Sequence, residues 1–439
     1  MSTLTAPAPD RTKVLAGSAI ALLMGGALYS FSVFAPPFSE LRGWAVPDIM
    51  FAFGLTSMLA PVVMIASGFL VDRGYARQLM LAGGILYGLG YVGGGLTDNL
   101  TMFYLSYGIV TGVGQGIMYA VALSNTMKFY PDKRGFASGI ITGGMGAGSA
   151  LFAPLGRALI SAFGVSQAFI ILGVVFAVAV ALVALFLTQP CPPGYTPPGW
   201  TPPAAAGGRP GGFRHLDWKG MISTIQFWIM MPVFICGAFF GLMITSNLSP
   251  IGQGMFGLSA GTAALYVSLL AVFNALGRIA WGTISDRIGI LASLMAVFVI
   301  AAGALVLLGT ARGIVVLTIG VVVLGFGFGG IMSLFPPLTM SNFGPKNQGV
   351  NYGIVFSAYA LSGLVAPRWG ASIAQANDGD FSQAFLIAAG IAVLGLVLTL
   401  VYRAVDRSRP VQGRPVEAAP TPAPGAEAPG QAAGAPTQS

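Results

Sequence analysis

Apolar segments long enough to cross a membrane recur along the whole chain. Because a bilayer-spanning helix needs about 20 mostly apolar residues, each segment predicts one transmembrane helix. Only 8% of the 439 residues are charged and 55% are hydrophobic, whereas soluble domains carry roughly 25% charged residues. The sequence therefore predicts an all-α polytopic membrane protein with 12 transmembrane helices. The expected spans are 14–36, 48–71, 78–97, 101–126, 136–162, 166–188, 221–247, 261–284, 290–311, 313–338, 349–374 and 382–404.

Two Pro- and Gly-rich stretches divide the chain. The first, residues 189–220, contains CPPGYTPPGWTPP and predicts a flexible linker between two six-helix bundles. The second, residues 405–439, is rich in Pro, Ala and Gly and predicts a disordered tail. We therefore expect an N-terminal segment at 1–13, one bundle at 14–188 and another at 221–404. The first apolar run is too long for a cleavable signal peptide, so it is expected to remain as a span.

Most Lys and Arg residues fall in short loops on one side of the predicted membrane. Because such loops mark the cytoplasmic side, both termini and the linker are expected to be cytoplasmic, in a protein of the plasma (inner) membrane. The net charge of +8 arises largely from these loops and does not predict nucleic-acid binding. The chain has two cysteines and one histidine, His215 in the linker, so neither a metal cluster nor a cofactor is expected.

The two halves of the sequence share motifs at matching helix junctions. Gly68–Leu79 reads GFLVDRGYARQL and Gly282–Ser293 reads GTISDRIGILAS, so both contain Gly-x-x-x-Asp-Arg before a turn. FYPDKRGFASG precedes the fifth span and NFGPKNQGVNYG precedes the eleventh. This repetition predicts two parallel, pseudo-symmetric six-helix halves around a central pathway, which is a known plan for transporters.

The two Asp-Arg loops predict a conformational latch. Asp72 with Arg73, and Asp286 with Arg287, lie where a carboxylate can pair with a neighbouring helix end or a basic residue at the cytoplasmic face. That pairing has to break when this side of the protein opens. The alternative is that these charges only set the topology. In both interpretations the four residues are gating or structural rather than substrate-binding.

Glycines recur every four residues in the fourth and fifth spans, a spacing that lets helix backbones approach closely. The sequence GVGQG in this region superficially resembles a nucleotide-binding loop. No predicted strand precedes it and no Gly-Lys-Ser/Thr follows, so that interpretation is rejected. Near the outer ends of the fifth and eleventh spans, Arg157 and Arg368 lie close to Pro154 and Pro367. Both arginines are expected to snorkel to the interface, with outer recruitment of substrate as the alternative.

One arginine lies deep inside a predicted span. Arg278 falls within 261–284, too far from the Asp286 loop for easy snorkelling. A charge at the centre of a span costs roughly 2.5–3.5 kcal/mol on insertion scales, and such charges usually pair or mark a substrate path. No Asp or Glu lies in the interior of another apolar run, so an anionic substrate is the predicted partner of Arg278. The alternative is a structural arginine satisfied by backbone carbonyls.

Aromatic and polar side chains at a comparable depth predict a pocket around Arg278. An arginine can hold a carboxylate with a bidentate fork, while tyrosine hydroxyls donate the remaining hydrogen bonds. Asn274, one turn from Arg278, is expected in the same cavity. Because a lone tyrosine in a span usually packs with its hydroxyl satisfied, the prediction depends on the combination. The other expected lining residues are Tyr29, Tyr119, Tyr359, Phe328 and Met332.

These residues carry a resemblance to a known family. The chain resembles major facilitators of the oxalate/formate antiporter family, which lies close to the monocarboxylate transporters. The matching segments are FYPDKRGFASG with Tyr119 ten residues ahead, VFNALGRIAWGTISDRIG, GFGFGGIMSLFPP and NYGIVFSAYALSG. The resemblance covers about residues 14–404, excluding the linker, and implies the major facilitator fold. It also implies that Arg278 holds an anion, in that family together with a lysine of the eleventh helix.

The resemblance breaks at the second cation. The lysine position is Tyr359 in this chain, and a further tyrosine of the family is replaced by Met332. Because Coulomb energies are large in a low-dielectric cavity, one cation favours a substrate with one negative charge, such as lactate, pyruvate or formate. The retained aromatic positions are Tyr29, Tyr119 and Phe328. The side chains expected to accept a short alkyl chain are Leu28, Met332 and Phe335. An oxalate-type dicarboxylate antiporter is the alternative.

The expected activity is secondary active transport by alternating access rather than enzyme catalysis. The sequence offers no nucleophile–base pair and no intramembrane His/Asp set for an enzyme. Coupling stays open between proton-linked movement and anion exchange, because no acidic residue lies in the interior of a span. The expected partners are a small organic anion, protons in the proton-linked case, and the lipid bilayer. The expected state is a monomer.

Overall fold

The computed structural model describes residues 10–200 and 215–408. Within these ranges all regular structure is helical, and 12 helical spans are long and apolar enough to cross a membrane. This confirms the predicted all-α polytopic fold. The last helix runs to Ser408, slightly into the predicted tail. The remainder of that tail and most of the predicted N-terminal segment lie outside the described residues.

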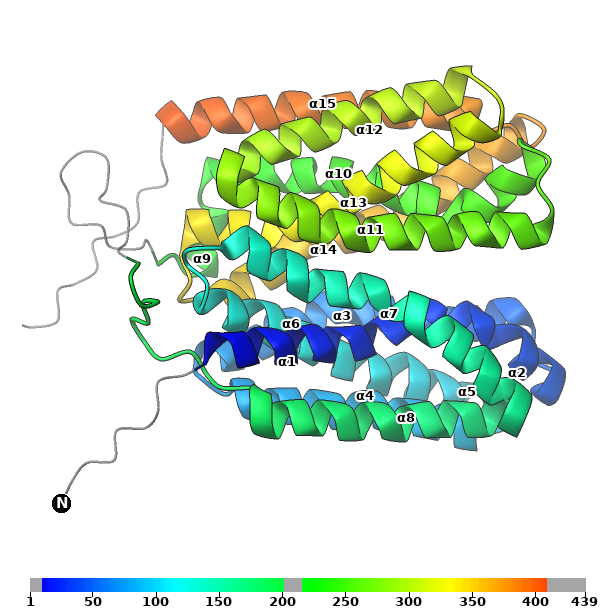
Figure 1. Cartoon of the computed structure of the whole chain (residues 1–439), viewed down its shortest axis with the longest axis horizontal. Coiled ribbons are helices and arrows are strands. Elements are labelled where there is room, and N and C mark those ends of the chain that lie inside the picture. Colours follow the sequence, from blue (N-terminus) through cyan, green and yellow to red (C-terminus); the bar gives the residue numbers. More distant parts are fainter. Residues whose placement is uncertain (1–9, 201–214, 409–439) are drawn as a thin grey trace, which may run out of the picture.

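The N-terminal half forms the lower bundle in Figure 1, drawn in blue to green. Its elements are α1 (Arg11–Gly25), η1 (Gly26–Val33), α2 (Ala35–Arg42), α3 (Val46–Asp72), α4 (Ala76–Leu96), α5 (Leu100–Phe103), η2 (Tyr104–Val110), α6 (Thr111–Lys128), α7 (Arg134–Phe163), α8 (Val165–Leu182) and η3 (Val183–Leu187).

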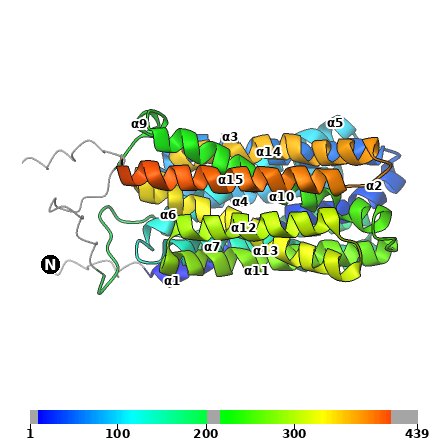
Figure 2. The same cartoon turned by 90° about the horizontal axis from the view of Figure 1, so that it is seen from above.

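The C-terminal half forms the upper bundle, drawn in green to red. Its elements are α9 (Trp218–Ile222), α10 (Ile225–Gly254), α11 (Ala260–Ile288), α12 (Ile290–Thr310), α13 (Ile314–Phe343), α14 (Gln348–Ala376) and α15 (Ser382–Ser408). Most helices of the two bundles follow one common axis, as the rotated view in Figure 2 shows.

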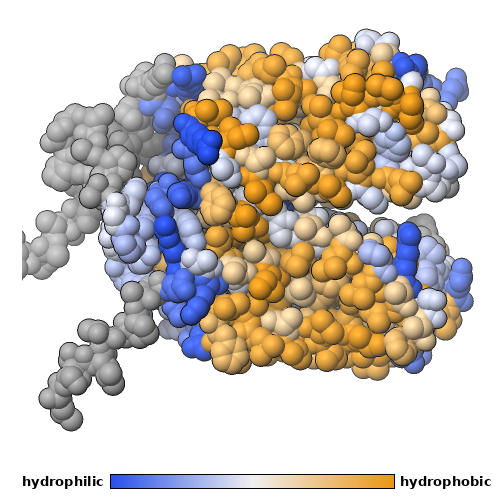
Figure 3. Space-filling view, in the orientation of Figure 1, coloured by the Kyte–Doolittle hydropathy of each residue, from blue (hydrophilic) through white to orange (hydrophobic). Residues whose placement is uncertain are grey.

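The surface has the polarity expected of a membrane protein. Apolar side chains cover the flanks of both halves, and hydrophilic side chains gather at the two ends of the molecule (Figure 3). The first described residue of α1, the last residue of α15 and the described ends of the linker share one end (Figure 1). We call this the linker end and the opposite end the open end.

Several predicted spans differ in detail from the helices observed, and two of these differences have a local cause. The seventh begins at Ile225 rather than 221, because Asp217 caps the short helix α9 and Thr224 then caps α10 by accepting from Phe227 N at 3.3 Å. The first changes from α-helix to 3₁₀-helix at Gly26. There the Tyr87 hydroxyl lies 3.3 Å from the Met24 carbonyl oxygen and 3.2 Å from that of Gly25. This change of helix type precedes the turn that carries Tyr29.

The two halves repeat with a constant offset. Asp72 and Asp286 are 214 positions apart, and the same separation relates Gly135 to Gly349. Helix α7 packs against α11 and α13, and its equivalent α14 packs against α3 and α6. We call these contacts the α7 seam and the α14 seam. Together they join the halves near the linker end and confirm the predicted pseudo-symmetry.

Glycine allows the backbones to meet in both seams. A Cβ atom on Gly135 would collide with the Gly282 carbonyl oxygen, and a Cβ atom on Gly349 would lie 2.7 Å from the Gly68 Cα. Neither obstacle is a flexible side chain that could move aside. The predicted close approach of helices at small residues is therefore present, and it closes the linker end.

Candidate functional site

The aspartates of the two repeated loops each hold the first turn of a helix in the opposite half. Asp286 of α11 accepts hydrogen bonds from the backbone N–H groups of Gly135 at 2.8 Å and Phe136 at 2.7 Å. Asp72 of α3 accepts from Gly349 N at 3.1 Å and from Val350 N at 3.4 Å. A carboxylate is favoured at a helix N-terminus by the unpaired N–H groups and the helix dipole. Both contacts must break if the linker end opens.

The basic partners in these contacts differ from the adjacent arginines named above. Lys128, at the end of α6, pairs with Asp72 at 2.8 Å, and Arg134 lies within the electrostatic field of Asp286. Arg73 and Arg287 are exposed, and their side chains make no hydrogen bond or ion pair with the residues described. Their gating role therefore stays a prediction. Lys128 and Arg134 were missed because they belong to other helices and come together with the aspartates only through folding.

Further from the linker end than the Asp286 contact, two more hydrogen bonds cross the α7 seam. The Ser138 hydroxyl donates to the Ser333 carbonyl oxygen of α13 at 2.8 Å. One turn further along α7, the Thr142 carbonyl oxygen accepts from Arg278 Nη1 at 2.8 Å. Arg278 therefore belongs to the C-terminal half but bonds to the main chain of the N-terminal half.

Arg278 is only partly satisfied by these contacts. Its side chain is 5% exposed, and Nε donates to Asn274 Oδ1 at 3.0 Å. Within residues 10–200 and 215–408, no hydrogen-bond acceptor is found for Nη2 of Arg278 or for the buried Nδ2 of Asn274. The alternative of a structural arginine satisfied by backbone carbonyls thus accounts for one hydrogen bond, the one to Thr142. Donors on both side chains stay available for a ligand oxygen.

Four tyrosine side chains gather around this guanidinium. Electrostatic interactions connect Arg278 with the hydroxyls of Tyr119, Tyr352 and Tyr359. Tyr29, which is 39% exposed, places its hydroxyl beside that of Tyr359. The Tyr352 hydroxyl lies near that of Tyr119, but it has no described partner in strict hydrogen-bond geometry. The site is therefore rich in hydrogen-bond donors.

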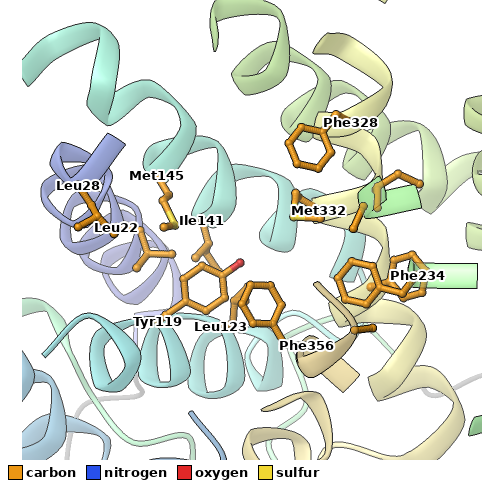
Figure 4. Packing of buried hydrophobic residues seen from close by; sticks show 14 of the residues in the cluster. Leu22, Leu28, Tyr119, Leu123, Ile141, Met145, Phe234, Phe328, Met332 and Phe356 are labelled. Atoms are coloured by element: carbon orange, nitrogen blue, oxygen red, sulfur yellow. The ribbon is translucent and has the colours of Figure 1, made fainter. Parts of the chain in front are cut away.

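The aromatic rings form a wall that passes from one half to the other. Tyr119 of α6 stacks on Phe356 of α14 with ring centroids 5.4 Å apart, and Phe356 stacks on Tyr359 at 4.9 Å. Figure 4 shows the Tyr119 hydroxyl directed into the space between α7 and α13, with Phe356 beside its ring. The sequence analysis missed Phe356 and Tyr352. The 3–4-residue spacing of Tyr352, Phe356 and Tyr359 along α14 was the available signal.

The predicted apolar residues are buried in the packing of the two halves in the present conformation. Phe335 has no exposed surface and stacks on Phe234 with centroids 4.0 Å apart. Leu28 and Met332 are 3% exposed, and Phe328 is 6% exposed against Gly241 of α10. The structure brings Arg278, Asn274 and the three predicted tyrosines together. It places the four apolar side chains in the surrounding packing, so their contact with a substrate stays a prediction.

The halves separate toward the open end. A Cβ atom on Gly54 of α3 would meet nothing within 4 Å, in contrast to Gly68 on the same helix. Figure 3 shows a hollow between the two halves at the end away from the linker. We call this hollow the cleft. Arg278 lies in the α7 seam, between the cleft and the linker end.

Known proteins resemble this chain in sequence and in architecture. The sequence profile of the Major Facilitator Superfamily matches residues 16–367. The chain is 29% identical to the oxalate:formate antiporter of Oxalobacter formigenes over 378 residues, which cover 86% of this chain and 87% of that protein. It is 26% identical to monocarboxylate transporter 11 of Mus musculus over 414 residues, which cover 90% of this chain and 88% of that protein.

Solved structures agree on the fold. The chain superposes on the transporter FucP in the outward conformation with a TM-score of 0.68 and 17% identity, over 89% of this chain and 98% of that one. It superposes on the human organic anion transporter MFSD10 with a TM-score of 0.68 and 13% identity, over 89% and 100%. The profile match spans most of the chain, and the 12 spans form two repeated halves. The chain belongs to the Major Facilitator Superfamily of transporters.

Proposed function

We propose that this chain is a secondary active transporter of small monocarboxylate anions of the lactate, pyruvate or formate kind, working by alternating access. The observation that carries the proposal is Arg278, a buried cation with an unused Nη2 in a donor-rich site between the halves. A carboxylate supplies both the missing charge and the missing acceptors. The relatives named for formate and for monocarboxylates support this substrate class.

The count of cations supports a substrate with one negative charge. Lys128 already faces Asp72 in the α14 seam, and Arg134 already faces Asp286 in the α7 seam. Among the described residues around the aromatic wall, Arg278 is the cation that remains. A second carboxylate would have to be buried against hydroxyl groups alone, which is costly.

A dicarboxylate exchanger is the second candidate, and one observation favours it. The oxalate:formate antiporter resembles this chain over most of both sequences. At Tyr359, where the family is expected to carry a lysine, this chain offers a hydroxyl beside Tyr29 instead of a charge. Comparing the uptake of oxalate with the uptake of formate decides between the two candidates.

The hydrogen bond from Arg278 to Thr142 suggests how binding is coupled to movement. While the site is empty, this bond helps to hold α11 against α7. An arriving carboxylate competes with the Thr142 carbonyl for the guanidinium and weakens the seam at this level. An empty carrier therefore reorients less readily than a loaded one, which suits either anion exchange or proton-linked carriage of the acid.

We further propose that the linker end is cytoplasmic and that the protein resides in the plasma (inner) membrane. The basic loops at this end, with Arg11, Lys128 and Arg134 among them, support that orientation. The cleft then faces outward. Cysteine labelling from one side of sealed vesicles tests the orientation independently of transport.

Reconstituted liposomes test the substrate. We expect labelled lactate, pyruvate or formate to enter, and oxalate to enter poorly. Arg278→Gln and Arg278→Lys should lower uptake about 10- to 100-fold, because hydrogen bonds to a charged group are worth roughly 1.5–3 kcal/mol and lysine lacks the fork. The matched control is Met64→Leu, at the equivalent position of α3. Undiminished uptake in both Arg278 variants would refute the site.

The same liposomes separate the coupling modes. Proton-linked transport requires uptake to follow an imposed pH gradient without internal anion. Exchange requires an internal carboxylate and ignores the pH gradient. Preferential exchange of oxalate would establish the dicarboxylate alternative.

A further inference from the structure

A second cavity lies at the open end of the N-terminal half, away from Arg278. Its volume is ≈370 Å³, and its walls come from η1, the start of α2 and the last turns of α7. Three of its lining side chains are polar, Arg157, Ser32 and Ser161, and the rest are apolar. A cavity of this size accommodates a small organic acid.

The helical periodicity of α7 relates this cavity to the face of α7 that meets α11 nearer the linker end. On α7, Gly139 and Gly146 face α11 across the seam. Arg157 is five turns beyond Gly139, which returns it to the same face of the helix. On the neighbouring 3₁₀-helix η1, Ser32 lies three residues after Tyr29 and therefore on the same side of the helix. Arg157 lies roughly 22 Å along α7 from Thr142 at 1.5 Å per residue.

The polar groups of this cavity are unoccupied by protein partners. In the described residues, Arg157, Ser32 and Ser161 have no side-chain hydrogen bond or ion pair, and no acidic residue lines the cavity. Two other arginines near the open end are compensated: Arg312 pairs with Asp380 at 3.1 Å, and Arg42 donates to the Gly95 carbonyl oxygen at 2.8 Å.

We propose that this cavity is a recruitment site at which a small carboxylate binds before it reaches Arg278. The carboxylate faces the Arg157 guanidinium and the hydroxyls of Ser32 and Ser161, and its alkyl part rests against Val33 and Ile160. A cation at the mouth of a low-dielectric cleft raises the local concentration of anions and their rate of arrival. This inference builds on the proposed function and adds a second, shallower site for its substrate.

Transport kinetics from the open end give the first test. Arg157→Gln should raise the KM for uptake about three- to tenfold and leave kcat unchanged, because Arg157 is far from the Arg278 site. Arg157→Lys should restore most of the affinity, since it keeps the charge. The matched control is Arg312→Gln, which removes an already compensated charge at the same end. An unchanged KM in Arg157→Gln overturns the recruitment site while the proposed function stands.

Thiol reactivity tests the cavity without relying on transport. The background carries Cys191→Ser and Cys236→Ala, although burial already raises the pKa of the Cys191 thiol to about 12. In this background, Ser161→Cys should react several-fold faster with a sulfonate-bearing methanethiosulfonate than with a neutral one of matched intrinsic rate. Arg157→Gln should abolish that preference, and lactate or formate should slow the reaction.

The two assays separate the possible failures. An equal rate ratio with and without Arg157 overturns the recruitment site, whatever the protein transports. If the wild type moves no monocarboxylate, the proposed function fails. An anion preference that depends on Arg157 but is indifferent to lactate and formate overturns the carboxylate assignment.

Discussion

The α7 seam and the α14 seam occupy equivalent places in the two repeated halves but differ in chemistry. The α7 seam has a polar bond at three successive levels: Asp286 to the first turn of α7, Ser138 to Ser333, and Arg278 to Thr142. Each level has an equivalent 214 positions away in the α14 seam. Among the described residues, only the aspartate level is repeated there as a hydrogen bond of strict geometry between the halves.

The other two levels of the α14 seam are aromatic and apolar. Tyr352 and Tyr119 stand where the α7 seam has Ser138 and Ser333. Met64, which is fully buried, occupies the position of Arg278, and Phe356 that of Thr142. This contrast shows a division of tasks within a symmetric scaffold. The α7 seam carries the cation and its bond to Thr142, and the α14 seam carries the aromatic wall and hydroxyls.

The largest expected effect comes from the glycine backbone contacts that both seams share. Gly135→Ala places a Cβ against the Gly282 carbonyl, and Gly349→Ala places one 2.7 Å from the Gly68 Cα. Because backbone cannot move aside, we expect each substitution to shift the population toward an open linker end by more than tenfold. Spin labels at Tyr75→Cys and Ile288→Cys, both exposed at this end, report the opening in a background without native cysteines.

Gly54→Ala is the matched control for these glycines, since a Cβ there meets nothing within 4 Å. It should leave the distance distribution unchanged. If Gly135→Ala and Gly349→Ala also leave it unchanged, the seams are not what closes the linker end. A large shift from one and none from the other would show that the backbone contacts are as asymmetric as the side chains.

An intermediate effect is expected when either of the two aspartates is replaced by asparagine. Asp286→Asn removes the charge at the N-terminus of α7, and Asp72→Asn does so at α14, where the bonds are longer. We expect Asp286→Asn to favour the open linker end about 5- to 30-fold, from roughly 1–2 kcal/mol of lost helix-end interaction. The same pair of spin labels measures the shift.

Lys128 gives this prediction a double-mutant test. Since Lys128 pairs with Asp72 at 2.8 Å, Lys128→Gln should be strongly non-additive with Asp72→Asn. Lys128→Gln should be additive with Asp286→Asn, because Lys128 has no described contact with Asp286. Equal coupling of Lys128 to both aspartates would contradict the separation of the two latches.

These contacts also show where sequence reasoning stops. Apolar run length predicted the 12 spans, and the repeated Asp-Arg loops predicted the two halves, because both depend on local sequence. The cost of burying a charge singled out Arg278 without any structure. The Thr142 carbonyl could not be foreseen, because any residue offers a backbone oxygen and only packing selects one. Lys128 was hidden for the same reason, since Arg73 is nearer to Asp72 in sequence but not in contact.

The smallest effect concerns Ser138 and its equivalent, Tyr352. Ser138→Ala removes the buried hydrogen bond to the Ser333 carbonyl oxygen that crosses the seam. We therefore expect the closed state of the linker end to be destabilised by about 1 kcal/mol. Tyr352→Phe removes a hydroxyl that has no described partner in strict geometry, so the spin labels should register almost no change. Because that hydroxyl lies in the field of Arg278, the same variant should raise the KM for carboxylate. Opposite outcomes, with closure sensitive to Tyr352 and substrate affinity sensitive to Ser138, would reverse the division of tasks between the two seams.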